Sequence, residues 1–209
     1  MISLHGTVVV GEFSRHFSLD VRNEIVGIFG ANGIGKTSLL RTVAGLCPLI
    51  EGELCVNEVI VDDPAKNQFV QPELREIGMV FQDHSLFPFM TALDNAAFPL
   101  VMRGMKRSAA RKLANEMMEQ FGVANVAEQS APTLSGGQSQ RVAIVRALVG
   151  APSAVLLDEP LSAIDEESRK GVRNLIREHL CRLGVSAIVV SHDRADLDHL
   201  CTRIENYTR

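Results

Sequence analysis

The hydrophobic pattern of the chain alternates short apolar runs with longer stretches of helical periodicity. Helical spacing is found at residues 37–44 and 166–183, and a hairpin-like pair of short apolar segments lies at residues 54–56 and 59–61. Apolar runs that predict buried strands lie at residues 25–29, 77–81, 154–157 and 187–190. Strands that alternate with helices in this way predict an α/β fold with a parallel sheet covered by helices.

The middle of the chain, residues 85–150, has a different pattern. Thr91 and Asp94 mark a helix start, and apolar residues recur at helical spacing over 108–121. We expect a mostly helical insertion here, with residues 1–84 and 151–209 forming the α/β core of a single domain.

Composition and charge limit the possible functions of the chain. The chain has 209 residues, of which 46% are hydrophobic and 22% charged, and its net charge is -4. The composition is close to that of ordinary globular proteins, which argues against disorder. Because the net charge is negative, we do not expect nucleic acid to be a partner. No apolar stretch reaches the roughly 18 residues of a membrane helix. A reducing compartment, with no zinc site or disulfide framework, is expected from the spacing of Cys47, Cys55, Cys181 and Cys201.

A phosphate-binding motif, G-x-x-x-x-G-K-T, lies between the first predicted buried strand and its helix. Glycines let consecutive backbone N–H groups converge on phosphate oxygens, and the helix N-terminus adds its positive dipole end. Lys36 would supply a positive charge, and the Thr37 hydroxyl is placed to bind Mg²⁺. The predicted nucleotide contacts from this segment are Gly30, Ala31, Asn32, Gly33, Ile34, Gly35, Lys36, Thr37 and Ser38.

Two carboxylates follow another predicted strand, at residues 155–157. Asp158 would lie at the carboxyl edge of the sheet, where phosphate loops also lie, and is a natural partner for Mg²⁺. Glu159 could polarise a water molecule for attack on a γ phosphate. The alternative is an acidic strand end exposed to solvent.

Four further motifs occur in a fixed order along the chain. They are Gln82 after the strand at 77–81, Leu134-Ser135-Gly136-Gly137-Gln138, Ser162-Ala163-Ile164-Asp165, and Ser191-His192-Asp193. With the phosphate loop and the acidic strand end, they resemble the motifs of ATP-binding cassette (ABC) ATPases, over nearly the whole chain. The resemblance implies a P-loop NTPase fold, with a RecA-like parallel sheet, an N-terminal antiparallel β subdomain and an inserted helical signature subdomain.

The resemblance also implies a mechanism with ATP and Mg²⁺ and a head-to-tail dimer. On that basis Thr37, Gln82 and Asp158 would bind Mg²⁺, while Glu159, His192 and Gln82 would act in hydrolysis. The residues expected to contact ATP held by the second subunit are Ser135, Gly136, Gly137, Gln138 and Asp165. An ABC ATPase also has an aromatic residue that stacks on adenine, for which Phe13 is our first candidate and Phe17 the second.

Residues 86–104 resemble the importer ATPases that serve molybdate, sulfate, ferric iron, polyamines and sugars. That resemblance implies a homodimer on the cytoplasmic face of the membrane, docked on permease subunits through Phe87, Phe89 and Met90 and served by an extracytoplasmic solute-binding protein. An oxyanion, a metal or a polyamine is the expected solute, and no C-terminal regulatory domain is expected after His192. The alternatives are an exporter ATPase, a non-transport ABC ATPase, a kinase with the same phosphate loop, or a nucleotide-binding protein without catalysis.

Overall fold

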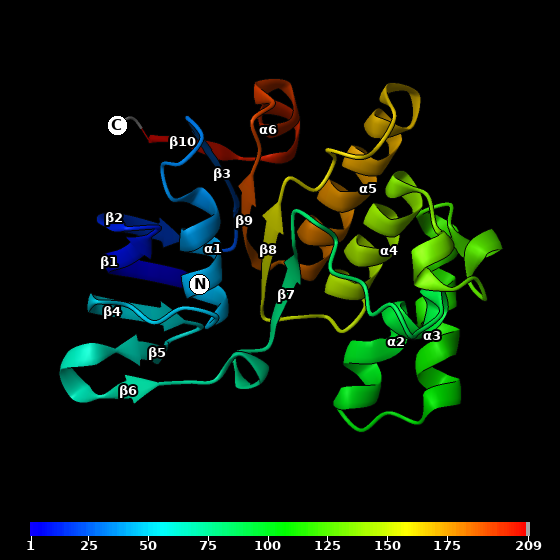
Figure 1. Cartoon of the computed structure of the whole chain (residues 1–209), viewed down its shortest axis with the longest axis horizontal. Coiled ribbons are helices and arrows are strands. Elements are labelled where there is room, and N and C mark those ends of the chain that lie inside the picture. Colours follow the sequence, from blue (N-terminus) through cyan, green and yellow to red (C-terminus); the bar gives the residue numbers. More distant parts are fainter. Residues whose placement is uncertain (208–209) are drawn as a thin grey trace.

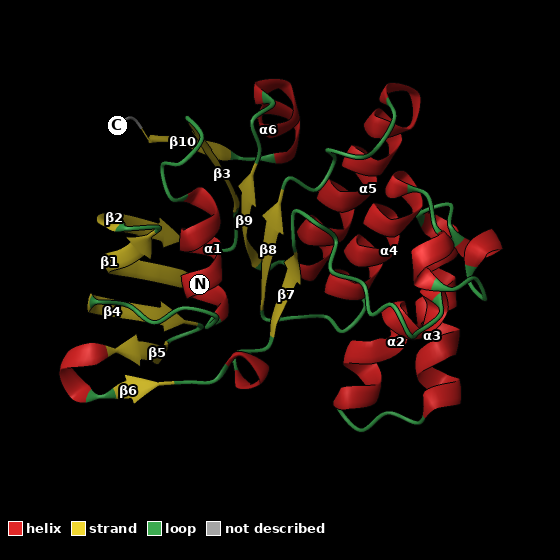
Figure 2. Ribbon diagram, viewed as in Figure 1, coloured by secondary structure: helices red, strands yellow, loops and turns green. Residues whose placement is uncertain are grey.

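The computed structural model describes residues 1–207 as two sheets with helices between and beside them (Figures 1 and 2). The strands are β1 (Ile2–Val10), β2 (Phe13–Val21), β3 (Ile25–Gly30), β4 (Glu51–Val56), β5 (Val59–Asp63), β6 (Gln68–Phe69), β7 (Ile77–Val80), β8 (Ala154–Asp158), β9 (Ser186–Val190) and β10 (Arg203–Tyr207). The α-helices are α1 (Lys36–Ala44), α2 (Ala92–Met102), α3 (Arg107–Gln120), α4 (Gly136–Leu148), α5 (Glu166–Leu183) and α6 (Arg194–Leu200). Within this described part, every helix is too short or too polar to cross a bilayer.

The two sheets differ in strand direction. The parallel sheet has the order β10-β3-β9-β8-β7, so the predicted buried strands lie side by side. The other sheet, in the order β2-β1-β4-β5-β6, is antiparallel in every pairing. An N-terminal antiparallel sheet beside a parallel sheet is the predicted fold class, which the structure confirms.

Alternate residues of the central strand β8 face two different cores. Ala154 and Leu156 pack with α1 and the antiparallel sheet, whereas Val155 and Leu157 pack with the helices on the other side. Because successive side chains of a strand point to opposite faces, a strand buried on both sides is apolar throughout. Helix α1 therefore lies between the two sheets, and α4 and α5 cover the opposite face of the parallel sheet (Figure 1).

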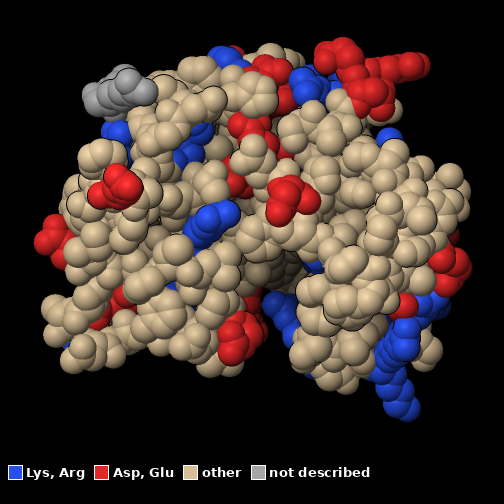
Figure 3. Space-filling view, in the orientation of Figure 1, with Lys and Arg blue, Asp and Glu red and all other residues tan. Residues whose placement is uncertain are grey.

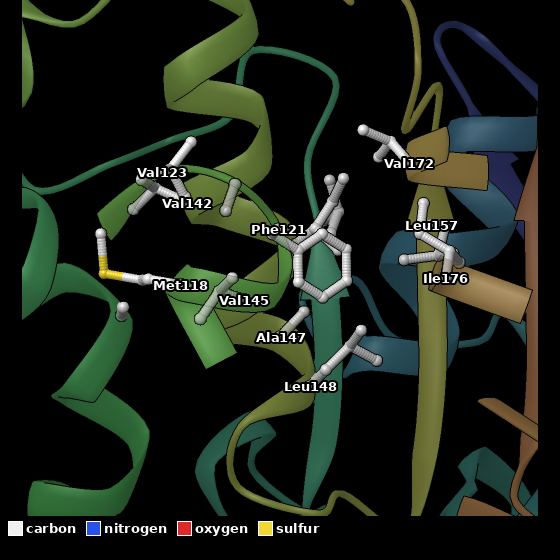
Figure 4. Packing of buried hydrophobic residues seen from close by; sticks show 14 of the residues in the cluster. Met118, Phe121, Val123, Val142, Val145, Ala147, Leu148, Leu157, Val172 and Ile176 are labelled. Atoms are coloured by element: carbon white, nitrogen blue, oxygen red, sulfur yellow. The ribbon is translucent and has the colours of Figure 1, made fainter. Parts of the chain in front are cut away.

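Helices α2, α3 and α4 form a packed group beside the edge strand β7. Figure 4 shows Met118 and Phe121 near the end of α3 against Val142 and Val145 of α4, with Leu157 of β8 beyond them. Phe121 is only 2% exposed, so this group shares one continuous core with the parallel sheet. The position of α4 relative to the sheet is therefore fixed by apolar packing.

Several elements depart from the sequence expectations. The N-terminal hairpin, for which no residue ranges were predicted, is formed by β1 and β2, which pair residue for residue from Ile2 with Val21 to Val10 with Phe13. The predicted hairpin of β4 and β5 is present, and it turns at Asn57 and Glu58, which both have positive φ as a tight two-residue turn requires. Helix α6 and strand β10 have no counterpart among the predicted elements.

Candidate functional site

The phosphate-binding motif spans the turn from the end of β3 to the start of α1. Gly33 and Gly35 have φ values of 78° and 98°, a left-handed conformation that favours glycine. The Lys36 ammonium donates hydrogen bonds to the carbonyl oxygens of Gly30 (2.7 Å) and Ala31 (2.9 Å). These bonds hold the Lys36 side chain against the first residues of its own loop.

The β1–β2 hairpin closes one side of this loop. A Cβ atom on Gly35 would lie 2.7 Å from Cγ2 of Val10 and 3.3 Å from Cζ of Phe17. Position 35 therefore requires glycine for two reasons, because Val10 approaches the backbone too closely for a Cβ atom and because the backbone has a positive φ. Ile34 is 5% exposed, so its side chain is buried and only its backbone is free to contact a phosphate.

Asp158 lies at the carboxyl end of β8 and is 2% exposed. Burial raises the pKa of Asp158, and a hydrogen bond from the Thr37 side chain acts against that rise. Burial also lowers the pKa of Lys36, although Glu159 and Asp158 oppose the shift. The lysine and the two carboxylates are thus near enough to influence one another's charge.

A cavity of about 320 Å³ brings these groups together. Its wall is made by the hairpin, the phosphate loop and the ends of the central strands. The lining residues are Val10, Asn32, Gly33, Gly35, Lys36, Thr37, Ser38, Gln82, Asp158, Glu159 and Val190. The fold therefore brings most of the predicted loop residues, Gln82 and both carboxylates to one site, whereas Gly30, Ala31 and Ile34 do not line the cavity.

The oxygen donors at this site fit a Mg²⁺ ion. Thr37, Gln82 and Asp158 line both this cavity and a neighbouring one of about 640 Å³. A hydroxyl, an amide oxygen and a carboxylate are hard donors of the kind that Mg²⁺ binds, usually together with phosphate oxygens and water. Residues 1–207 contain no cluster of three or more His, Cys, Asp and Glu side chains that could hold a metal alone. Because Mg²⁺ prefers octahedral coordination, an ion held by these three donors would complete its coordination with phosphate oxygens and water.

Glu159 is held by the segment that follows β9. One carboxylate oxygen accepts a hydrogen bond from the His192 backbone N–H at 2.8 Å. The other is 2.9 Å from His192 Nδ1 and accepts a bond from the Ser191 hydroxyl at 3.3 Å. The φ of Glu159 is 50°, an uncommon value for a residue other than glycine. The predicted partners Glu159 and His192 are therefore in direct contact.

The predicted signature residues lie outside the cavity. Ser135 is the N-cap of α4, and its hydroxyl accepts a hydrogen bond from the Gln138 N–H, while the Gln138 side chain accepts one from the Ser135 N–H. Asp165 caps α5 in the same manner through the Ser168 N–H. None of Ser135, Gly136, Gly137, Gln138 and Asp165 lines the cavity of the phosphate loop.

The two candidates for adenine stacking have different environments. Phe17 is 1% exposed and its ring packs against Tyr207 at a centroid distance of 5.2 Å, so it offers no free face. Phe13 is 78% exposed at the start of β2, but it does not line the cavity. Val10, its partner across the hairpin, does line the cavity.

A comparison with known families fits this arrangement. A family model described as ABC transporter matches residues 15–162. The chain belongs to the ABC transporter family. Its structure also resembles a solved dimeric ABC transporter cassette, MJ0796, with a TM-score of 0.86 and 30% sequence identity over 100% of this chain and 94% of that one. A second structure of that cassette is described as a post-hydrolysis state bound to ADP and Pi, with a TM-score of 0.84 and 30% identity over 99% of this chain and 94% of that one.

Relatives with similar sequences are described as import proteins. The chain is 43% identical over 188 residues to the glucose import ATP-binding protein GlcV of Saccharolobus solfataricus, covering 90% of this chain and 53% of the relative. It is 39% identical to the trehalose/maltose import ATP-binding protein MalK of Thermococcus litoralis, covering 94% and 54%. For the Fe(3+) ions import ATP-binding protein FbpC of Brucella abortus, the identity is 41% and the coverage 81% and 46%. The chain thus spans about half the length of these relatives.

Some residues of the site were not predicted from the sequence. Val10 lines the cavity, and Ser191, which the sequence indicated only as part of a motif and without a role, donates a hydrogen bond to Glu159. Gln140 reaches the Glu159 backbone from α4, and Arg146 donates to carbonyl oxygens in the loop after Gln82. A polar residue inside an apolar helix is a signal for Gln140 and Arg146, whereas a lone valine gives none.

Proposed function

We propose that this chain is the ATP-binding and ATP-hydrolysing subunit of an ABC importer. The observation that carries the proposal is the single cavity lined by Lys36, Thr37, Asp158 and Glu159. A phosphate loop, hard oxygen donors and a carboxylate within one small space are the groups that phosphoryl transfer to water requires.

Each group has a distinct part in the proposed reaction. The backbone N–H groups of the loop and the α1 N-terminus bind the phosphates, while Lys36 exchanges its carbonyl partners for phosphate oxygens. Thr37, Gln82 and Asp158 would hold Mg²⁺, which would neutralise phosphate charge. Glu159 accepts a proton from the attacking water, and His192 orients that carboxylate through their contact at 2.9 Å.

A second copy of the chain would complete the site. Ser135 presents the start of α4 as an anion-binding end, but it lies outside its own cavity. In a head-to-tail dimer, Ser135, Gly136, Gly137 and Gln138 would meet the phosphates held by the partner, with Asp165 beside them. The dimeric form of the MJ0796 cassette supports this arrangement.

Import is supported by the names of the relatives and by an apolar cavity between the two halves of the molecule. This cavity, of about 400 Å³, is lined by β7, the loop after Gln82, α2 and α4, and Figure 3 shows a hollow in this region of the surface. Phe87 lines it, and Phe89 is 80% exposed nearby. We infer that a permease subunit docks here, which would place the chain at the cytoplasmic face of the membrane.

The relatives are named for glucose, trehalose/maltose and ferric ions. We propose a small solute that is delivered by an extracytoplasmic binding protein and recognised outside this chain. The proposed solute classes are metals, oxyanions and polyamines, as expected from the sequence, and also sugars.

The test of hydrolysis is phosphate release from Mg-ATP by the purified chain and two variants. The parent is expected to release phosphate, Lys36→Ala to lose binding and release, and Glu159→Gln to keep binding while release falls about 100-fold or more. Hydrolysis by Glu159→Gln at the parent rate would contradict the role of Glu159. No release by the parent, alone or with its permease, would contradict the proposed function.

A further inference from the structure

Gln140 is a completely buried polar side chain on α4, with 0% exposure. Its Nε2 atom donates to the Glu159 carbonyl oxygen at 2.7 Å, and its Oε1 atom accepts from the Ala163 N–H at 2.8 Å. Both ends of the amide are therefore engaged with one short segment of another part of the chain. A buried amide is stable only when it is satisfied in this way, which makes the pairing specific.

The segment that Gln140 holds is the turn that leads from β8 towards α5. It begins at Glu159, whose positive φ must be maintained by its surroundings. The Glu159 carbonyl oxygen also accepts from the Ser162 N–H (3.2 Å) and hydroxyl (3.0 Å). The Gln140 amide thus ties this turn to α4, while the Glu159 N–H ties it to β9 by donating to the Val190 carbonyl oxygen at 2.9 Å.

The N-terminal end of α4 packs on the same turn. A Cβ atom on Gly137 would lie 3.2 Å from the Ala163 carbonyl oxygen, and one on Gly136 would lie 3.4 Å from the Ala163 Cβ. Ser135, Gln140 and the 159–163 turn therefore form one contiguous unit inside a single chain. Within it, the helix whose N-terminal end would face the partner's phosphates is bonded, through Gln140, to the backbone of this chain's own Glu159.

We propose that Gln140 is a positioning residue for hydrolysis, which sets the Glu159 backbone from α4 and so links the signature end of each subunit to that subunit's own catalytic carboxylate. The proposal rests on the proposed ATPase function. Gln140 does not line the nucleotide cavity. Its loss is therefore expected to affect the rate of the chemical step and to leave nucleotide binding intact.

The first test is the steady-state kinetics of Gln140→Leu. This substitution removes both hydrogen bonds at similar volume, so we expect kcat to fall about tenfold or more, with KM for ATP within about threefold of the parent. Ile144→Val is the matched control, because Ile144 is also fully buried on α4 but makes no such bond. A kcat loss of equal size in the control, or an unchanged kcat in Gln140→Leu, would overturn the proposal.

A second variant, Gln140→Glu, tests the role of the donor. A protonated carboxyl group can donate one hydrogen bond and accept another, which would replace the amide's bonds to Glu159 and Ala163, whereas a carboxylate can only accept. Burial raises the pKa of such a carboxyl, so kcat relative to the parent should be higher near about pH 6 than near about pH 8. A ratio that does not change with pH would count against the bond to the Glu159 carbonyl.

The outcomes separate this proposal from the function on which it rests. If the parent shows no ATPase activity with its permease present, the proposed function fails and this inference fails with it. If the parent is active and Gln140→Leu matches it in kcat, only the inference fails. Hydrogen exchange at the Ala163 amide gives a readout without turnover, and it should be faster in Gln140→Leu than in the parent.

Discussion

At the scale of single residues, Lys36 carries the main positive charge of the site. It is 8% exposed, and its only hydrogen-bond acceptors in the described part of the chain are two carbonyl oxygens of its own loop. A lysine side chain that is bonded to neutral carbonyl oxygens can reorient toward a bound anion, because the anion offers a stronger, charge-assisted hydrogen bond. Phosphate binding would therefore need only a local rearrangement of the side chain.

Replacing Lys36 with alanine should remove most of the affinity for ATP. We expect binding at least about 100-fold weaker by calorimetry, since charge-assisted bonds to the phosphates are lost. Lys112→Ala, an exposed lysine on α3, is the control and should bind like the parent. Equal affinity of Lys36→Ala and the parent would exclude Lys36 from the phosphate site.

The residues that the sequence could reveal are those in contiguous motifs. Lys36, Thr37, Asp158 and Glu159 follow predicted strands, so their place at one sheet edge follows from the fold class. Val10 could not be assigned to the site, because only the folded hairpin brings it there, and the polar character of Gln140 in an apolar helix could not identify Glu159 as its partner before the helix was packed.

At the scale of elements, one carboxylate joins helix α2 to helix α3. Asp94, near the start of α2, is paired with Arg107 at 2.8 Å and with Arg111 at 2.6 Å. Burial acts to raise the pKa of Asp94, but the hydrogen bonds from the two arginines outweigh it and hold the pKa below its usual value. The ionised carboxylate therefore stabilises the packing of the two helices.

Asp94→Asn should lower the stability of the chain in a pH-dependent manner. We expect a loss of about 1 kcal/mol near pH 7, or a Tm lower by about 2–4 °C. Because the folded pKa is depressed, the stabilisation is present above the unfolded pKa of about 3.9 and disappears as pH falls through the folded value. The difference in Tm should therefore narrow below about pH 4.

Thermal unfolding of both proteins across this pH range is the measurement. Asp198→Asn is the control, since its pair with Arg194 is about half exposed and should contribute little. A Tm difference that stays constant as pH falls would contradict the role of the Asp94 carboxylate.

Elements with strong periodicity were predicted well, and others were not. Helix α5 spans the predicted residues 166–183, and the predicted central strands β8 and β9 are present. Helix α4 lacked a clear apolar stripe because it is buried almost all round, from Gln140 to Leu148. Strand β10 lies at the edge of the sheet and mixes polar and apolar residues, so its sequence lacks the clear apolar–polar alternation that predicts a strand.

At the scale of the whole molecule, the phosphate loop and the signature end are on different sides of the parallel sheet. Helix α1 packs on one face and α4 on the other (Figure 1). The packing of α4 on its own face of the sheet holds Ser135 away from the cavity of the same chain, which Ser135 does not line. Two copies in head-to-tail order would bring each signature end to the other's cavity, and ATP would then favour the closed pair.

The most direct test of this account is the mass of Glu159→Gln in solution by light scattering. With Mg-ATP, the mass should rise from that of the 22.8 kDa chain to about twice that value, and with ADP the protein should stay monomeric. Ser135→Arg in the same background should bind ATP but remain monomeric, because the new side chain blocks the interface. A monomer with Mg-ATP for Glu159→Gln, in the presence of its permease as well as alone, would contradict the shared nucleotide site.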